Sequence, residues 1–230
     1  MKIAYQGIEG SYSDSCAKVM YPGCETISCK TFDDVFNKAN ESDELRAIIP
    51  ESNKTTGNIG VEYLIFKYRL NIYAEHFYPI HHHLLGLPGS KIQDIKNIYS
   101  HAQGLSQCSN FIRKNKLIEN VRADTAGSAK YVSDSKNISQ AAIASKESAN
   151  IYNLDILASN IEDEQGNVTR FLVMGKPIKQ PELNEEKYIT SFLFKLKSKP
   201  AALVSALQGI AYNGVNLTKL QSFPEKNSFT

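Results

Sequence analysis

The chain has 230 residues, of which 42% are hydrophobic and 22% charged, with 13 Gly and 8 Pro. This composition excludes a disordered, fibrous or low-complexity protein and is typical of one large globular domain or a domain and a half. The 26 basic and 24 acidic side chains leave a net charge of only +2. Because so small an excess creates no field that attracts polyanions, we expect neither nucleic acid nor membrane as a partner.

The N-terminal sequence and the cysteines bear on the compartment. Residues 1–7 turn polar too early to hold the roughly 7–15 apolar residues of a signal peptide, and no run approaches the ~20 apolar residues that span a bilayer. Cys16, Cys24, Cys29 and Cys108 include no C-x-x-C pair, which disfavours zinc and dithiol chemistry. Free thiols in a reducing compartment are the simpler interpretation, so we expect a cytoplasmic protein.

The first three quarters of the chain alternate predicted strands with predicted helices. The predicted strands are Lys2–Gln6, Ala47–Ile49 (closed by Pro50), Asn71–Ala74, Ile98–Ser100, Asn120–Ala123, Ala141–Ala144 and Val168–Met174. The predicted helices are one carrying Cys16, Ala17 and Met20, one from the Thr31 capping box to Ala39, and Leu105–Arg113, Ala126–Val132 and Lys146–Tyr152. This alternation is typical of an α/β protein whose parallel strands are joined by crossover helices.

A second unit is expected after a polar segment, Gly175–Glu182, whose two prolines predict a linker. The predicted elements beyond it are a strand at Ile189–Lys197, a helix from Pro200 to Asn213-Gly214 with Leu203, Leu207 and Ile210 on one face, and a strand at Val215–Leu220. A single strand–helix–strand unit exposes an apolar sheet face, so we expect it to need a partner surface.

Polar residues that follow predicted strands are the candidates for a binding site, because sites in open α/β sheets lie at the carboxyl ends of strands. The turn Gly7–Ser13 leads into a helix N-terminus, where backbone N–H groups and the hydroxyls of Ser11 and Ser13 could bind an anion. A plain helix cap explains the same residues. No glycine-rich nucleotide-binding motif is present, which disfavours nucleotide cofactors.

Other strand ends add uncharged donors and a few cations. They are Asn53, Lys54, Thr55 and Thr56 in the loop Pro50–Gly57, Ser100-His101-Ala102-Gln103 with Gln107, Asp124-Thr125-Ala126-Gly127, and Asn167-Val168-Thr169-Arg170-Phe171. Such a set suits a small anionic ligand. His81-His82-His83 resembles a metal cluster, but successive residues of a strand point to opposite faces, so we expect no metal. His101 could act as a general acid or base, or only form hydrogen bonds at the start of a helix.

Four segments in this order resemble the prephenate dehydratase family. They are Ala4-Tyr5-Gln6-Gly7 with Gly10-Ser11-Tyr12-Ser13, Tyr99-Ser100-His101 with Gln107-Cys108, Asp124-Thr125-Ala126-Gly127, and Asn167-Val168-Thr169-Arg170-Phe171, which contains the family's Thr-Arg-Phe motif. The tail resembles a regulatory ACT module at Ala202-Leu203-Val204 and Asn216-Leu217-Thr218-Lys219.

The resemblance implies an α/β fold with a two-lobed catalytic domain like a type II periplasmic binding protein, followed by a partial ferredoxin-like ACT domain. The implied boundaries are 1–176 for the catalytic domain (one lobe from 1–76 with 166–176, the other from 77–165), 177–187 for a linker and 188–230 for the ACT segment. The family's activity is a cofactor-free, carbon–oxygen lyase reaction that converts prephenate to phenylpyruvate in phenylalanine biosynthesis. A homodimer or homotetramer is the implied assembly.

The resemblance also assigns roles to residues. Thr169 would donate a hydrogen bond or proton to the departing hydroxyl, which requires electrostatic assistance because an unperturbed threonine is a poor acid. The implied catalytic residues are Thr169, Asn53, Gln107 and Ser100, and the implied substrate-binding residues are Ser11, Ser13, Lys54, Thr125, Ala126, Arg170 and Phe171.

The loop after the third predicted strand departs from the family pattern Pro-x-Glu-Asn-Ser-x-x-Gly. Ser52 stands where the family has glutamate and Lys54 where it has serine, a change of two charge units. Two unit charges ~4 Å apart, in an effective dielectric near 20, interact with an energy of roughly 4 kcal/mol. Lys54 could pair with a substrate carboxylate, point to solvent, or mark a paralogue that binds an aromatic anion without turnover. Arogenate, the aminated analogue of prephenate, is an alternative substrate.

The tail departs as well. The phenylalanine effector site implied by the resemblance would use Ala201, Ala202, Leu203, Val204, Asn216 and Leu217. Ala201 stands where the family has glycine, Gln221-Ser222-Phe223-Pro224 replaces Glu-Ser-Arg-Pro, and only the first half of the module is matched. A methyl group at Ala201 could crowd a ligand that approaches the backbone. We therefore predict that feedback inhibition by phenylalanine is weak or absent.

Overall fold

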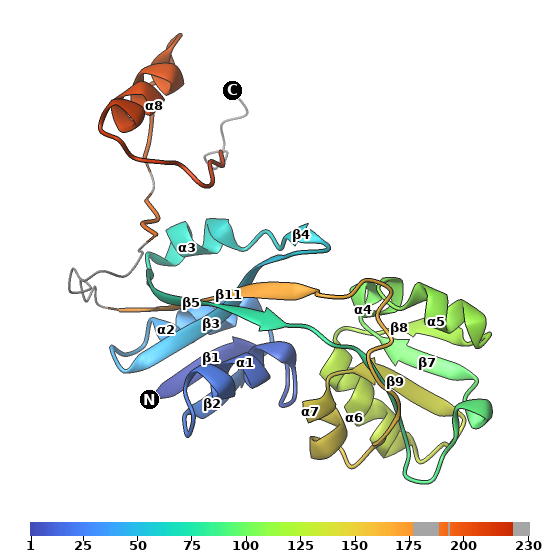
Figure 1. Ribbon diagram of the computed structural model, residues 1–230. Coiled ribbons are helices and arrows are strands. Elements are labelled where there is room, and N and C mark those ends of the chain that lie inside the picture. The colour runs from blue at the N-terminus through green and yellow to red at the C-terminus, as the bar shows by residue number, and fades with distance from the viewer. Residues whose placement is uncertain (177–188, 193, 223–230) are drawn as a thin grey trace. The chain divides into compact units, whose positions relative to one another are not determined.

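The computed structural model describes residues 1–176, 189–192 and 194–222, and the chain divides into two units, Met1–Pro181 and Glu182–Thr230. The first unit contains two sheets, each with its own helices (Figure 1). The expected two-lobed α/β class is confirmed. No helix in the described ranges is long and apolar enough to cross a membrane.

The first lobe is built on a mixed sheet of strand order β2-β1-β3-β11-β5, with the short β4 paired to β3. Its strands are β1 (Lys2–Gln6), β2 (Glu25–Cys29), β3 (Leu45–Asn53), β4 (Gly57–Asn58), β5 (Asn71–Pro79) and β11 (Val168–Gly175), and its helices are α1 (Tyr12–Met20), α2 (Phe32–Ala39) and α3 (Glu62–Tyr68). β1 is parallel to β2 and β3, whereas β11 is antiparallel to both β3 and β5.

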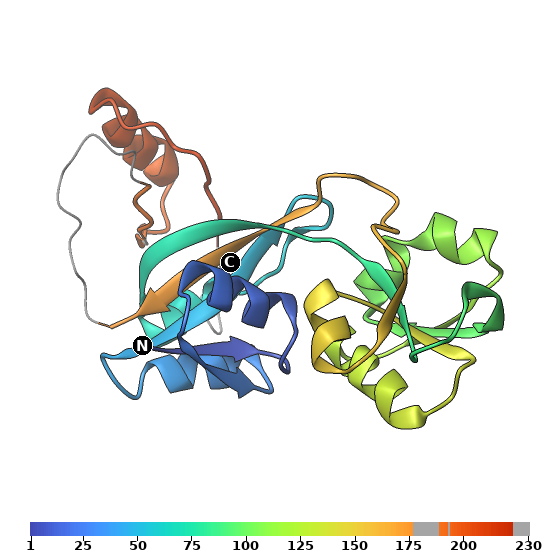
Figure 2. The same cartoon turned by 60° about the horizontal axis from the view of Figure 1, so that its bottom comes forward.

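The second lobe has a sheet of strand order β10-β6-β9-β7-β8. Its elements are β6 (His83–Gly86), the 3-10 turn η1 (Ile92–Asp94), β7 (Asn97–Ser100), α4 (Ala102–Ser106), α5 (Ser109–Lys114), β8 (Ile118–Val121), α6 (Thr125–Ser135), β9 (Gln140–Ala144), α7 (Lys146–Ile151) and β10 (Asp155–Ala158). The chain passes between the sheets twice, after β5 and again before β11, as both views show (Figures 1 and 2). Residues in these two connections therefore lie between the lobes.

Local sequence signals account for the start of two helices and for the central strand. Thr31 and Asp34 form the predicted capping box, with backbone-to-side-chain bonds of 3.1 and 3.0 Å. Ser11 caps α1. In β3, Ile48 and Ile49 are both fully buried but belong to different core clusters, because successive strand residues point to opposite faces. The central strand is therefore covered on both sides, as its continuous apolar run indicates.

Two local expectations are wrong. Pro50 lies inside β3 and does not close it, because the strand pairing is irregular between Arg170 and Phe171, and a bulge tolerates a residue without an N–H group. The helix expected at 105–113 is split in two. The backbone N–H of Asp163 binds the carbonyl of Gln107 at 2.7 Å, and the Asp163 carboxylate accepts the hydroxyl of Ser109 at 2.8 Å, so a new helix starts there.

The sheets are also mixed and not parallel throughout, since β11, β6 and β10 run antiparallel to their neighbours. The strand expected at 120–123 begins two residues earlier. Elements that the sequence patterns did not predict are β2, β4, α3, β6, η1 and β10.

The second unit contains α8 (Ala202–Tyr212), which starts two residues after the expected Pro200. Within its described residues, neither 189–197 nor 215–220 forms a strand. A strand needs a partner to satisfy its backbone groups, and the described part of this unit supplies none. The expected linker lies mostly outside the described residues, and so does the Phe223-Pro224 pair.

Candidate active site

Asn53 and Thr169 occupy opposite positions on the antiparallel strands β3 and β11. Asn53 donates from Nδ2 to Thr169 Oγ1 at 2.9 Å, and its Oδ1 accepts the backbone N–H groups of Thr55 and Thr56 at 3.0 and 3.1 Å. Thr169 is 7% exposed. Among the described residues its hydroxyl proton has no acceptor, so that proton is available to a ligand.

Asn167 extends this pair towards the second lobe. Its Oδ1 accepts Asn53 Nδ2 at 2.8 Å and the Thr55 hydroxyl at 3.1 Å, while its Nδ2 donates to Gln107 Oε1 at 3.4 Å. Three of the four residues assigned to catalysis, Thr169, Asn53 and Gln107, are thus brought together. Asn167 was missed as a site residue, although it lies two positions before Thr169 and period-2 spacing places both on one face.

His82 connects this cluster to α1. It lies between β5 and β6, is 3% exposed, and is bonded through Nε2 to Gln107 Oε1 and through Nδ1 to the Tyr12 hydroxyl, each at 2.8 Å. The Tyr12 hydroxyl also lies 2.7 Å from the carbonyl of His81. Burial lowers the pKa of His82 and raises the pKa of Tyr12 well above 10, so both rings are neutral at neutral pH. The polar cluster that ends at Thr169 is therefore uncharged.

The histidine run does not converge on one point. His81 Nδ1 contacts Glu162 Oε1 at 2.9 Å, and His83 Nδ1 accepts the backbone N–H of Asn160 at 3.3 Å. Burial opposes ionisation of Glu162, but hydrogen bonds from His81 and from backbone N–H groups outweigh it and lower the pKa. In the ranges that the structure describes, no group of three or more His, Cys, Asp or Glu side chains could hold a metal ion.

Two expected site residues lie in the core instead. Ser100 is fully buried, and its hydroxyl donates to the carbonyl of Ile143 at 2.7 Å, within the second lobe. Phe171 is 1% exposed and packs edge-on against Tyr78. Alternation along the strand places Phe171 on the face of the first sheet that packs against α1, whereas Ser100, the last residue of β7, bonds to a carbonyl of the neighbouring strand β9.

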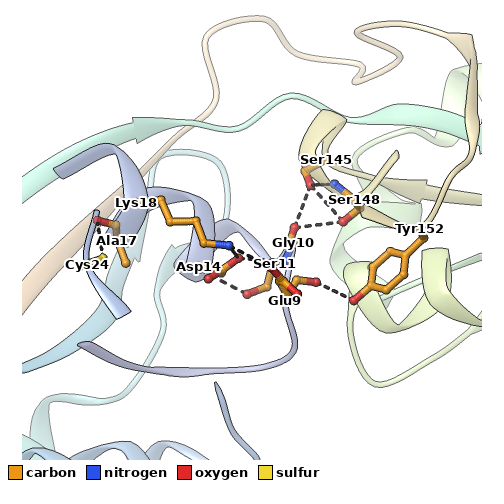
Figure 3. A network of polar contacts seen from close by, with 10 residues as sticks. All are labelled: Glu9, Gly10, Ser11, Asp14, Ala17, Lys18, Cys24, Ser145, Ser148 and Tyr152. Atoms are coloured by element: carbon orange, nitrogen blue, oxygen red, sulfur yellow. Dashed lines mark hydrogen bonds and ion pairs between the residues drawn. The ribbon is translucent and has the colours of Figure 1, made fainter. Parts of the chain in front are cut away.

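The N-terminus of α1 is already occupied by the chain's own carboxylate. Asp14 Oδ2 accepts the backbone N–H of Gly10 at 3.0 Å and pairs with Lys18 at 2.9 Å, while Ser11 caps the helix (Figure 3). Ser11 and Ser13 are both buried. This geometry favours the helix-cap interpretation over an anion site at the Gly10 turn.

The same turn contacts the second lobe. The Gly10 carbonyl accepts the hydroxyls of Ser145 and Ser148 at 2.8 and 2.9 Å, and the Tyr152 hydroxyl donates to the Glu9 carbonyl at 2.6 Å (Figure 3). Gly10 has φ +86, and an added Cβ would lie 3.0 Å from Ser148 Oγ. Only glycine fits this approach without strain.

The two cations expected to bind substrate differ in their surroundings. Arg170 contacts Glu75 at 2.6 Å on β5 and Glu51 at 3.2 Å on β3, so its guanidinium ties β11 to both neighbouring strands. Lys54 is exposed and reaches the carbonyl of Gly166 at 3.3 Å, beside the connection that leads to Thr169. Ser52 donates to Glu51 at 2.6 Å, so a buried carboxylate lies one residue before the position where the family has glutamate.

The remaining expected residues lie apart from this cluster. Thr125 and Ala126 begin α6, where Asp124 is the N-cap, beside a pocket of about 330 Å³ lined by Val121, Arg122, Ala123, Asp124 and Gly127. None of these lining residues belongs to the Thr169 cluster. Ala201 to Val204 form the start of α8 in the second unit, and Asn216 and Leu217 follow that helix without regular structure.

Comparison with known proteins points to one family. The family model described as Prephenate dehydratase matches residues 3–179. A curated relative, arogenate dehydratase/prephenate dehydratase 1 of Arabidopsis thaliana, named chloroplastic, is 41% identical over 228 residues, which cover 98% of this chain. The chain spans only 58% of that relative's length.

Two solved structures share the fold over the whole chain. One, described as a novel type of quorum quenching acylase, has a TM-score of 0.87 and 30% identity, and 84% of it is covered. The other is a prephenate dehydratase from Arthrobacter aurescens in complex with L-Phe, with a TM-score of 0.80, 23% identity and 77% coverage.

Proposed function

The chain belongs to the prephenate dehydratase family, and we propose that it converts prephenate to phenylpyruvate. In this reaction the bond to the ring carboxylate breaks, its electron pair completes the aromatic ring, and the ring hydroxyl leaves. Carbon dioxide and water are released, and one proton is consumed. The observation that supports the proposal is the Thr169 hydroxyl, whose oxygen accepts the Asn53 side chain while its proton remains available.

Thr169 would act at the departing hydroxyl. Because threonine is a weak acid, the negative charge that develops on Oγ during proton donation has to be stabilised by a preorganised donor. Asn53 Nδ2 supplies that hydrogen bond, and the backbone N–H groups of Thr55 and Thr56 hold the Asn53 side chain in place. Lys54, exposed in the same loop, would attract a substrate carboxylate.

Turnover by the purified protein tests this proposal. Prephenate is supplied, and phenylpyruvate is followed by its absorbance in alkali. We expect saturable formation of phenylpyruvate. Prephenate that binds without product above background would overturn the enzyme proposal and support the alternative of a paralogue that only binds an aromatic anion.

Arogenate dehydration is a second candidate, favoured by the names of the curated relatives, which are arogenate or combined arogenate/prephenate dehydratases. The reacting ring is the same in both substrates, so the Thr169 geometry serves either. Parallel assays that measure phenylpyruvate from prephenate and phenylalanine from arogenate give the ratio of the two kcat/KM values. A ratio strongly favouring arogenate would reassign the substrate without changing the site.

An acylase activity, as described for one of the two similar solved structures, is less well supported. Amide hydrolysis by a serine or cysteine enzyme requires the nucleophile within hydrogen-bond reach of a base. Among the residues that the structure describes, no hydrogen bond joins a serine or cysteine side chain to a histidine.

We also propose that the protein is a homodimer or homotetramer in the cytoplasm and that residues 188–230 are a partial ACT segment. Light scattering measures the oligomeric state, and cell fractionation determines the compartment.

A further inference from the structure

The orientation of every side chain in the Thr169 cluster can be deduced from the backbone. Asn53 Oδ1 accepts two backbone N–H groups, so the atom opposite it must be the NH₂ nitrogen. That NH₂ group faces both Thr169 Oγ1 and one atom of the Asn167 amide. A donor can face only an acceptor, so the Asn167 atom must be its oxygen, which the Thr55 hydroxyl also contacts.

The same reasoning continues to His82. With its oxygen towards Asn53, Asn167 presents its NH₂ group to Gln107, whose facing atom must therefore be an oxygen. This oxygen also contacts His82 Nε2 at 2.8 Å, so Nε2 must carry a proton. In the neutral ring Nδ1 then carries no proton, and it shares the single proton of the Tyr12 hydroxyl with the His81 carbonyl, which accepts that hydroxyl at 2.7 Å. The hydrogen bonds thus have one consistent direction from Asn53 to the His82 ring.

We propose that His82 is a positioning residue for the dehydration, an inference that rests on the proposed function. Its Nε2–H group fixes the amide of Gln107. That amide accepts a hydrogen bond from Asn167, whose oxygen then accepts the same Asn53 NH₂ group that faces Thr169. Without a donor at His82, the Gln107 amide can turn over and present NH₂ to NH₂ at Asn167. Asn167 would then have to turn as well and present its NH₂ group to the NH₂ group of Asn53. The hydrogen bond from Asn53 to Thr169 would be disturbed by that contact.

Two substitutions separate the two nitrogens of the ring. His82→Gln places an amide near the position of Nε2 and keeps a donor towards Gln107, whereas His82→Asn places an amide near Nδ1 and loses that donor. We expect His82→Asn to lower kcat about ten- to a hundredfold with KM within threefold, since small misplacements of catalytic groups have effects of that size. His82→Gln should stay within about threefold of the unmodified protein. If His82 only filled space, the kcat of His82→Gln would not exceed that of His82→Asn in this way.

His83→Asn is the matched control. His83 is the next residue, is also buried, and uses Nδ1 to accept the backbone N–H of Asn160, a role that the Asn oxygen preserves. Its kcat should be unchanged. If His82→Asn does not fold, Tyr12→Phe replaces it: loss of the hydroxyl beside Nδ1 should lower kcat several-fold and mix the two ring tautomers, which ¹⁵N NMR of the imidazole resolves.

The outcomes distinguish this inference from the proposed function. No turnover by the unmodified protein overturns the proposed function and the role of His82 with it. Turnover in the unmodified protein with equal kcat in His82→Asn and His82→Gln overturns only the inference. An imidazole NMR spectrum in which His82 is protonated at Nδ1 and not at Nε2 also overturns it.

Discussion

Asn53 and Thr169 are 116 positions apart in the sequence, yet their side chains meet across the β3–β11 pair with 2.9 Å between Nδ2 and Oγ1. The direction of this bond decides what Thr169 can do. Since the threonine oxygen accepts, its single proton is left for a ligand, and the charge on that oxygen is stabilised if the proton leaves. In the proposed reaction Thr169 would therefore act as the proton donor and Asn53 as its support, whichever of the two proposed substrates binds.

Substitution of Thr169 tests this relationship directly. We expect Thr169→Ala to lower kcat by about 10²–10⁴, the usual contribution of a positioned proton donor, with the Kd for prephenate nearly unchanged. Thr169→Ser keeps the hydroxyl and should retain most of the activity. Steady-state kinetics and calorimetric titration measure the two quantities. A fully active Thr169→Ala variant would show that the mechanism is wrong even if the substrate is right.

The parts of this site that the sequence predicted are those carried by short motifs at strand ends. Asn53 ends β3, Thr169 is the second residue of β11 and Gln107 follows α4, the helix after β7, and the fold brings these positions together. Phe171 shares a motif but not the site, because neighbouring strand residues alternate between faces and the face depends on which strands pair. Ser100 is likewise excluded, because its hydroxyl bonds to β9 within the second lobe. The mixed strand directions of both sheets depend on the same long-range pairing.

His82 and Tyr12 could not be assigned from the sequence for a different reason. A run of three histidines is typical of a metal site, and nothing local tells which nitrogen meets which partner. The contacts that define His82 come from α1 and from the end of α4, 70 and 25 residues away. Only the packed structure shows that its neighbours are a phenol and an amide rather than other metal ligands.

Arg170 should matter for stability more than for affinity. Its guanidinium lies between Glu75 and Glu51, and the Glu51 side chain is 4% exposed. Removing Arg170 leaves a buried carboxylate with a second one close by. We expect Arg170→Met to lower the free energy of unfolding by up to about 3 kcal/mol, the lower end for a broken buried pair because Arg170 and Glu75 are partly exposed.

Lys130→Met is the matched control, because Lys130 pairs with Asp134 on the exposed surface of α6. Such a pair contributes at most about 1 kcal/mol. Denaturant unfolding measures both variants. If Arg170→Met instead unfolds like the unmodified protein while KM for prephenate rises at least tenfold, Arg170 binds substrate, as the resemblance implied.

The Gly10 carbonyl should show how strongly the two lobes hold each other. Because Ser145 and Ser148 both donate to it, either single alanine variant leaves one hydrogen bond. We expect Ser148→Ala to cost about 1 kcal/mol or less, and Ser145→Ala about 1–2 kcal/mol because Ser145 is also the N-cap of α7. The double variant leaves this buried carbonyl without either donor and should cost more than the sum of the two. Thermal unfolding of the four proteins provides the cycle, with Ser135→Ala in α6 as a control. Strict additivity would contradict a shared acceptor.

Phenylalanine should have little effect on this chain. Ala201 has φ 62, a left-handed conformation that costs a residue with a Cβ about 1–2 kcal/mol, and it stands where the family has glycine. We expect millimolar phenylalanine to change neither kcat nor Tm. The control is Ala201→Gly, which relieves the backbone strain and removes the methyl group. A saturable response in the unmodified protein would contradict the prediction; a response only in Ala201→Gly would identify the methyl group as its cause.

The buried histidines predict the acid sensitivity of the fold. Burial lowers the pKa values of His82 and His83 below their ordinary value of 6.5. Between the folded and unfolded pKa values the unfolded chain binds protons that the folded chain does not, so stability rises with pH through that window. We expect the free energy of unfolding to be nearly constant between about pH 7 and 8 and to fall as the pH drops below 6.5.

Comparing the slope of unfolding free energy against pH between variants shows which residues cause the loss of stability. His82→Gln should remove part of the loss between pH 6.5 and the folded pKa, whereas Ser135→Ala, which changes no titratable group, should leave the slope as it is. At lower pH a further loss begins below 4.5, the ordinary pKa of the Glu162 carboxyl, and is complete once that carboxyl, with its lowered pKa, is protonated in the folded state too. Denaturant unfolding at half-unit pH steps measures both phases. An unchanged slope in His82→Gln would show that His82 takes up its proton equally in both states, and the neutral ring deduced from the cluster would then be wrong.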